Sequence, residues 1–231
     1  GTTIAARPAD EKHPYGHKKF ETLAALGITA MLFFVSINII KTSLGKFKNP
    51  SVPNIDWLSI VVMIITIAIN IFVIIYETSQ GKKLKSDVLL SDAIHTKSDV
   101  YVSLSVLLSL LFVKSGVPLL DPIISLLVAL VIIKAAIEIF IKASNVLCDA
   151  RVVDPENIVK LVSSINGVID CHEVRTRGRE DDFTTDFHII VNSEMTVEQC
   201  HELCHIINDS ISRNFPGIKD VHIHIEPYEP K

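Results

Sequence analysis

Two long stretches without a single charge constrain this chain more than any other feature. They are TLAALGITAMLFFVSINII at residues 22–40 and WLSIVVMIITIAINIFVIIY at residues 57–76. Each has about the 20 residues that a helix needs to cross the hydrocarbon of a bilayer. Two further apolar segments follow, so we predict transmembrane helices at about 22–43, 56–78, 88–114 and 119–144. The alternative is a soluble helical bundle, although such long uncharged runs are rare outside membranes.

Lysines near the helix ends indicate how the chain is oriented. Lys12, Lys18 and Lys19 precede the first helix, and GKKLKS at 81–86 joins the second to the third. Basic residues concentrate in cytoplasmic loops, and an even number of crossings returns the chain to its starting side. We therefore expect a multi-pass protein of the cell (inner) membrane, with both termini of this chain in the cytoplasm.

The sequence after residue 148 has the pattern of a globular domain. Asp154 followed by Pro155 is typical of a helix start, and Thr196 with Gln199 forms a capping box at another. Alternating segments between and after these helices predict strands, in the order α-β-β-α-β over residues 149–231. The net charge of -4 and the absence of a basic stripe argue against a nucleic-acid partner. No Ser/His/Asp or H-E-x-x-H arrangement suggests an enzyme.

Polar residues interrupt the third apolar segment near its start. Asp92, His95 and Asp99 share one helical stripe, with His95 and Asp99 one turn apart. A charge at the centre of a bilayer costs about 2.5–3.5 kcal/mol, so such residues usually serve a function. Imidazole nitrogen with carboxylate oxygen suits zinc and similar divalent ions, and the pair would supply half of a tetrahedral site. The alternative is a structural polar cluster near the helix end.

Three motifs in this order resemble the cation diffusion facilitator family, of the bacterial zinc and ferrous-iron efflux type. They are HPYGHKKFE at 13–21, H-x-x-x-D at 95–99, and the junction LCDARVVDPE ahead of the last domain. The resemblance implies six transmembrane helices, a cytoplasmic metallochaperone-like domain, homodimers, and exchange of divalent metal for protons. The expected fold class is thus an α-helical transmembrane domain at 22–148 with a C-terminal α+β domain at 149–231. Residues 1–21 are expected to form a cytoplasmic loop.

The resemblance also implies how the transport site is completed. His95 and Asp99 would pair with two acidic or histidine ligands on an earlier helix, which this sequence does not contain. We expect the first two helices of the family to be missing here, so that the transport site is half present. The implied function is efflux of zinc (Zn2+) or ferrous iron (Fe2+) by proton antiport, with a metal-sensing dimerisation domain. The alternative is a membrane-anchored metal-binding module without transport of its own.

A second candidate metal site lies in the loop before the first helix. Asp10, His13 and His17 flank PYG, and proline and glycine favour a turn that would bring the three side chains around one ion. The family resemblance implies a metal site in the same loop. Solvated loop histidines are the alternative.

A third candidate site is rich in histidine and lies in the last domain. Strand alternation sends His222, His224 and Glu226 to the face opposite the apolar side chains. The resemblance implies a cytoplasmic ligand set of His172, His188, His201, His224 and Glu226. His205 and His222 are additional and receive less weight, and surface histidines without metal are the alternative. Cys200 and Cys204 are expected to pack in the core, on one helical stripe with Val197, Ile207 and Ile211.

Overall fold

The computed structural model describes residues 2–5, 7–48, 57–114 and 120–229. These belong to two compact units, Gly1–Ser144 and Asn145–Lys231, which are described separately below. Residues 49–56 and 115–119, which connect predicted transmembrane helices, lie outside the described residues.

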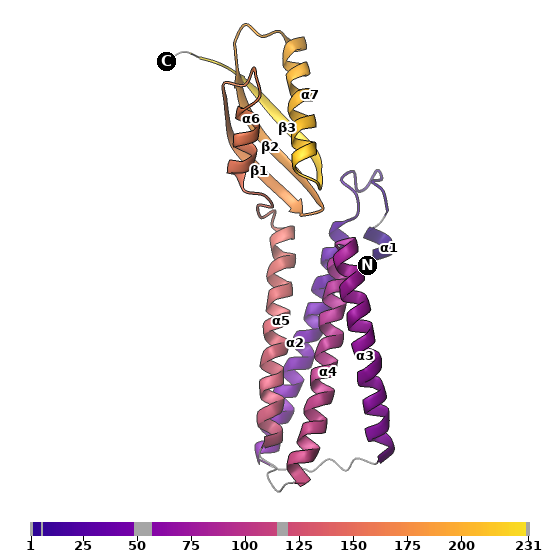
Figure 1. Cartoon of the computed structure of the whole chain (residues 1–231). Helices are drawn as coiled ribbons and strands as arrows, with labels where there is room; N and C mark the ends of the chain where they lie inside the picture. The colour runs from indigo at the N-terminus through magenta and orange to yellow at the C-terminus, as the bar shows by residue number, and fades with distance from the viewer. Residues whose placement is uncertain (1, 6, 49–56, 115–119, 230–231) are drawn as a thin grey trace. The chain divides into compact units, whose positions relative to one another are not determined.

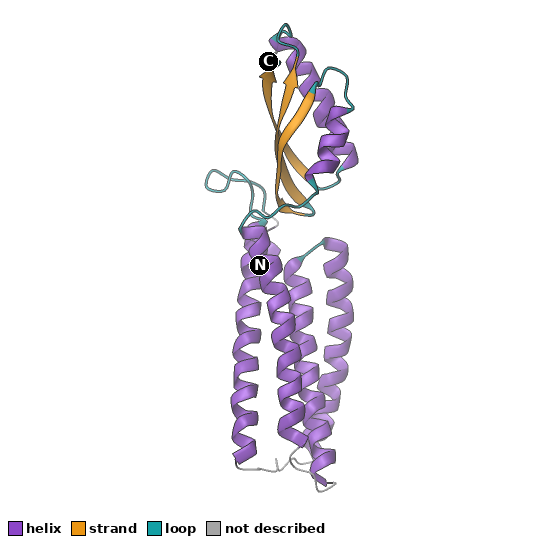
Figure 2. Ribbon diagram, turned by 90° about the vertical axis from the view of Figure 1, so that its left-hand side faces the viewer, coloured by secondary structure: helices purple, strands orange, loops and turns teal. Residues whose placement is uncertain are grey.

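Long helices dominate the first unit (Figure 1). They are α2 (Lys19–Lys48), α3 (Trp57–Leu84), α4 (Asp87–Lys114) and α5 (Leu120–Leu147), with a short α1 (Thr2–Ala5) beside α2. α2, α3 and α5 continue for three to six residues beyond their predicted C-terminal bounds. Figure 2 shows the long helices running nearly side by side.

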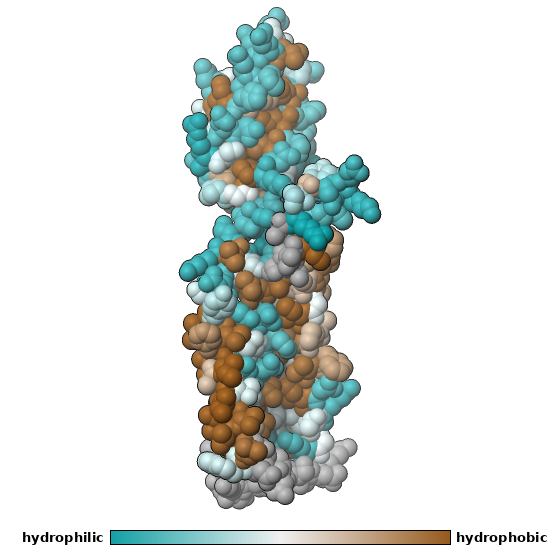
Figure 3. Space-filling view, turned by 90° about the vertical axis from the view of Figure 1, so that its right-hand side faces the viewer, coloured by the Kyte–Doolittle hydropathy of each residue, from teal (hydrophilic) through white to brown (hydrophobic). Residues whose placement is uncertain are grey.

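Three of the long helices are apolar enough to cross a membrane. These segments are Lys19–Phe47, Ile60–Leu84 and Leu120–Leu147. The described part of α4 is less apolar than these three helices. Its first half carries the ionisable residues Asp87, Asp92, His95, Lys97 and Asp99. The exposed side chains of the helical unit are largely hydrophobic, as Figure 3 shows for one face, and this is the surface expected of a protein in lipid.

Small side chains repeat every seven residues along the packed faces of the helices. The buried positions are Thr22, Thr29, Ser36 and Ser43 in α2; Ser91, Ser98 and Ser105 in α4; and Ala129, Ala136 and Ala143 in α5. Small residues let membrane helices approach closely, and a seven-residue period matches a left-handed crossing. Several of the hydroxyls donate a hydrogen bond to a backbone carbonyl of the preceding turn. These buried hydroxyl groups therefore have hydrogen-bond partners inside the bundle.

Polar contacts also join the helices near their ends. Lys46 of α2 pairs with the buried Asp121 of α5 at 2.7 Å, and Lys142 of α5 pairs with Asp87 of α4 at 2.9 Å. The buried Glu21 of α2 accepts a hydrogen bond from the Ser86 hydroxyl, which precedes α4. Glu21 therefore ties the start of α2 to the start of the helix that carries His95.

The second unit has the predicted order α-β-β-α-β. Its elements are α6 (Pro155–Ser163), β1 (Asp170–Arg179), β2 (Asp182–Val191), α7 (Val197–Asn214) and β3 (Ile218–Pro227). β1 pairs antiparallel with β2, and β2 pairs parallel with β3, so that β2 is central. Both helices cover one face of the sheet (Figure 2), and the other face carries the histidines.

The core of this unit lies between the sheet and its two helices. Its buried side chains include Phe187 and Ile189 of β2, with Leu203, Ile207 and Ile211 of α7. The predicted caps of α6 and α7 are both present. The stripe predicted for α7 is rotated, because Leu203 takes the central buried position and Val197 is 88% exposed. Cys200 packs against the core and Cys204 is half-buried.

Candidate metal centres

The pair of His95 and Asp99 lies on the third and fourth turns of α4. The Nε2 atom of His95 is 4.0 Å from a carboxylate oxygen of Asp99, and the Asp99 side chain is 50% exposed. The Nδ1 atom of His95 is buried and has no hydrogen-bond partner among the described residues. The pair therefore places an imidazole nitrogen and a carboxylate oxygen near one point, which is half of a tetrahedral site.

Asp92, on the same stripe as His95, lies close to a residue that the sequence analysis missed. This residue is Glu77 on α3, and one of its carboxylate oxygens is buried without a hydrogen-bond partner among the described residues. Glu77 directly follows the uncharged run 57–76, and a carboxyl group at the end of such a run was the available signal for it.

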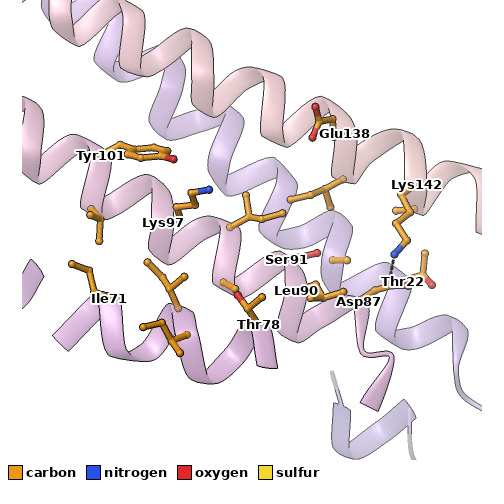
Figure 4. Close-up of a pocket in the computed structure, with 18 residues that line it drawn as sticks. Thr22, Ile71, Thr78, Asp87, Leu90, Ser91, Lys97, Tyr101, Glu138 and Lys142 are labelled. Carbon is orange, nitrogen blue, oxygen red and sulfur yellow. Dashed lines mark ion pairs between the residues drawn. The ribbon is translucent and has the colours of Figure 1, made fainter. Parts of the chain in front are cut away.

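A cavity of about 640 Å3 lies between α2, α3, α4 and α5 (Figure 4). Its lining is mainly apolar, with Asp87, Lys97, Glu138 and Lys142 as its charged members. In Figure 4 Lys142 reaches across the cavity to Asp87. His95 and Asp99 are not part of this lining, so the cavity and the ligand pair occupy different sides of α4.

The loop residues Asp10, His13 and His17 converge. Their ligand atoms all lie within 4.8 Å of one another. A carboxylate oxygen of Asp10 is 3.4 Å from Nδ1 of His13, and the other is 3.2 Å from Nε2 of His17. The predicted turn brings them together, since the Gly16 amide donates to the His13 carbonyl and Gly16 has a φ of 88°.

Neighbouring groups orient two of these ligands. Nδ1 of the buried His17 is 3.1 Å from the Pro8 carbonyl, and donation to that carbonyl leaves Nε2 as the nitrogen that faces Asp10. Backbone amides of His13 and Lys12 donate to Asp10, and the His13 amide in particular lowers the pKa of the Asp10 carboxyl. Asp10 is therefore held ionised, as a metal ligand must be.

A second group of three converges on the open face of the sheet. His172 of β1, His188 of β2 and Glu226 of β3 have ligand atoms within 4.8 Å of one another. Nδ1 of His188 is 2.9 Å, and Nε2 of His172 3.4 Å, from oxygens of Glu226. The hydrogen bond from His188, with the charges of nearby histidines, lowers the pKa of Glu226. We call these three residues the sheet cluster.

His224 and Glu173 border the sheet cluster. His224 pairs with His188 across the strands, with ring centroids 4.5 Å apart. Glu173 approaches His188 at 3.9 Å because a bulge follows His172 and Glu173 has a φ of 51°. Regular alternation would send Glu173 to the other face, so strand alternation does not predict this contact.

His201 does not join this group within one chain. It lies on α7, where its Nε2 atom is 3.0 Å from Nε2 of His205. The sheet and the core separate α7 from the open face that holds the sheet cluster. The structure thus brings four of the five predicted cytoplasmic ligands to one face and places the fifth elsewhere. His222 lies on the same open face and borders a shallow pocket with His188 and His224.

Comparisons with known proteins match both units. The family model of the cation efflux transmembrane domain matches residues 1–148, and that of the cation efflux protein cytoplasmic domain matches residues 151–228. The manganese efflux system protein MneP of Bacillus subtilis is 30% identical, over 97% of this chain and 78% of its own length. The cation-efflux pump FieF of Escherichia fergusonii is 27% identical, over 96% of this chain and 74% of its own.

A solved C-terminal domain is also similar to this chain. The copper form of the MamM C-terminal domain is 30% identical, covers 32% of this chain and 81% of its own, and has a TM-score of 0.30. The two family models together account for both the membrane helices and the dimerisation domain. The chain therefore belongs to the cation diffusion facilitator family of membrane cation efflux transporters.

Proposed function

We propose that this protein exports a divalent transition metal, zinc or ferrous iron, from the cytoplasm in exchange for protons. The observation that carries the proposal is the imidazole–carboxylate pair of His95 and Asp99 inside a membrane domain of the cation efflux family. Nitrogen with oxygen donors suits zinc and ferrous iron, whereas sites built from oxygen alone suit manganese better.

Proton exchange follows from the chemistry of His95. Metal binds the neutral imidazole, so a proton and a metal ion compete for the same nitrogen. Protons arriving from outside would displace the metal, and loss of the proton toward the cytoplasm would restore the ligand. The Nε2 atom of His95 faces Asp99 at 4.0 Å, so it is the nitrogen for which metal and proton would compete.

The other two sites would serve assembly and sensing. The loop site of Asp10, His13 and His17 is already gathered and oriented, so it would bind metal with little rearrangement. The sheet cluster, with His224 beside it, would sense cytoplasmic metal and strengthen the homodimer of the dimerisation domain. Metal can shift the equilibrium between monomer and dimer only to the extent that it binds the dimer more tightly than the monomer.

The test is zinc flux into vesicles that contain the full-length protein, recorded with a zinc dye inside and a pH dye outside. His95→Ala and Asp99→Ala should each abolish flux and leave the circular dichroism unchanged. Ser98→Ala is the matched control, because its buried hydroxyl donates only to the Ile94 carbonyl of its own helix. Normal flux in either ligand variant would refute the assignment, and flux without proton movement would refute antiport.

A membrane-anchored metal-binding module is the second candidate. It is favoured by one observation: the loop site and the sheet cluster each gather three ligand groups, whereas His95 and Asp99 gather two. In that case zinc would bind to the protein with no flux in the same vesicles. Binding and flux measured on one preparation therefore distinguish the two functions.

A further inference from the structure

The cavity between the four long helices has the size and the lining of a binding site for an amphiphilic molecule. Its volume of about 640 Å3 lies within the range of about 300–1,000 Å3 that is usual for small-molecule pockets. Apolar side chains from all four helices form most of its wall, among them Ala25, Ile74, Ile94 and Ile139. Because the helices around it include three that are apolar enough to cross a membrane, lipid is the amphiphile that surrounds this cavity.

The charges around the cavity do not balance. The carboxylate of Asp87 pairs with Lys142 at 2.9 Å, and that of Glu138 lies 4.0 Å from the ammonium group of Lys134. Both carboxylates that line the cavity therefore have a lysine beside them. Lys97 also lines the cavity, and among the described residues it has no carboxylate partner. The lining and its ion-pair partners thus carry one positive charge in excess.

Lys97 lies on α4, ten residues after the first residue of that helix, Asp87. Ten residues correspond to about 15 Å along a helix. A lysine at such a position in a membrane domain is costly unless its charge is paired or reaches water. Its ammonium group is 5.7 Å from the centre of the Tyr101 ring, which attracts the charge but does not neutralise it. Figure 4 shows Lys97 and Tyr101 on the α4 side of the cavity.

A basic group beside an apolar cavity matches the two halves of a phospholipid. Basic pockets between transmembrane helices bind anionic lipid headgroups. We propose that this cavity binds one anionic phospholipid, with its phosphate on the ammonium group of Lys97 and an acyl chain along the apolar wall. The single negative charge of phosphatidylglycerol balances the single excess positive charge. A zwitterionic lipid brings a cation of its own, which leaves that excess in place.

The lipid site is separate from the candidate metal centres. His95 and Asp99 are not among the residues that line the cavity, so the lipid does not occupy the position of a transported ion. Lys97 belongs to none of the three groups of metal ligands. The proposal therefore does not depend on the proposed transport function, and it can be tested without measuring flux.

The experiment measures lipid binding to the full chain in a neutral detergent by native mass spectrometry. Phosphatidylglycerol and phosphatidylcholine with identical acyl chains are titrated separately. Lys97→Gln removes the charge, and Lys97→Arg keeps it. Lys83→Gln is the matched control, because Lys83 is an exposed lysine of the neighbouring helix α3 and lies outside the cavity lining. A further arm adds inorganic phosphate as a competitor that has no acyl chain, and circular dichroism checks that each variant is folded.

We expect the wild type to bind one phosphatidylglycerol per chain more tightly than phosphatidylcholine. Lys97→Gln should weaken phosphatidylglycerol binding about fivefold and remove the preference, whereas Lys97→Arg and Lys83→Gln should bind like the wild type. Millimolar inorganic phosphate should not displace the lipid.

Three results would each overturn the proposal. The first is phosphatidylglycerol binding by Lys97→Gln that equals that of the wild type or of Lys83→Gln. The second is equal binding of the two lipids by the wild type, because the excess charge would then select nothing. The third is displacement of the lipid by inorganic phosphate, because the apolar wall would then contribute nothing to binding.

Discussion

Lys46 and Asp121 form an ion pair, and we expect substitution of the one to destabilise the helical unit more than substitution of the other. The two charges are 2.7 Å apart, and the side chains are 26% exposed for Lys46 and 8% for Asp121. At an effective dielectric constant of about 20, this separation corresponds to about 6 kcal/mol of attraction. Desolvation offsets much of that attraction, so the cost of a substitution depends on what is left behind.

Lys46→Met leaves the Asp121 carboxylate buried without its partner. Removing one member of a buried pair costs about 3–5 kcal/mol, and we expect a loss in that range. Asp121→Asn leaves Lys46, whose long side chain can reach water, and also removes an acidic residue from the first turn of α5. We expect this second substitution to cost only about 1–2 kcal/mol.

The double variant provides the decisive comparison. Adding Asp121→Asn to Lys46→Met removes the stranded charge, so stability should rise by about 2 kcal/mol relative to Lys46→Met alone. The assay is equilibrium unfolding by dodecyl sulfate in mixed micelles, followed by far-ultraviolet circular dichroism. The reasoning is refuted if Lys46→Met costs no more than Asp121→Asn, or if the double variant is as unstable as Lys46→Met.

Three further predictions concern the metal centres. Because the pKa of Glu226 is lowered from 4.5, its charge stabilises the folded domain above pH 4.5 and this contribution is lost at lower pH. The melting temperatures of wild type and Glu226→Gln should therefore converge as the pH falls. A difference in melting temperature that grows as the pH falls would contradict this. Gly16→Ala should destabilise the turn by about 1–2 kcal/mol, because Gly16 has a φ of 88°. The same substitution should weaken zinc binding by the loop, measured by calorimetry. An unchanged zinc affinity would show that the turn does not position the ligands. Zinc should tighten the dimer at pH 7.5 but not at pH 5.5 in analytical ultracentrifugation, because protons compete for imidazole; a dimer constant indifferent to zinc at pH 7.5 would exclude this regulation.

Patterns local in the chain were sufficient to predict much of this protein. The uncharged runs predicted long helices because apolar length is a direct requirement of a bilayer, and alternation predicted which strand residues share a face. The turn around Pro14 and Gly16 likewise depends on the backbone preferences of those residues. These features depend only on residues a few positions apart in the chain, so they can be predicted from the order of the residues.

Tertiary structure decided the contacts between residues that are distant in sequence. A bulge in β1 turns Glu173 toward His188, and the core layer separates His201 on α7 from the sheet cluster of the same chain. Glu77 lies near Asp92, and Lys46 pairs with Asp121, across different helices. The sequence alone determined which side chains could bind a metal or carry a charge. Strand register, helix rotation and helix packing decided which of them meet, because each depends on the sum of many weak contacts rather than on any one motif.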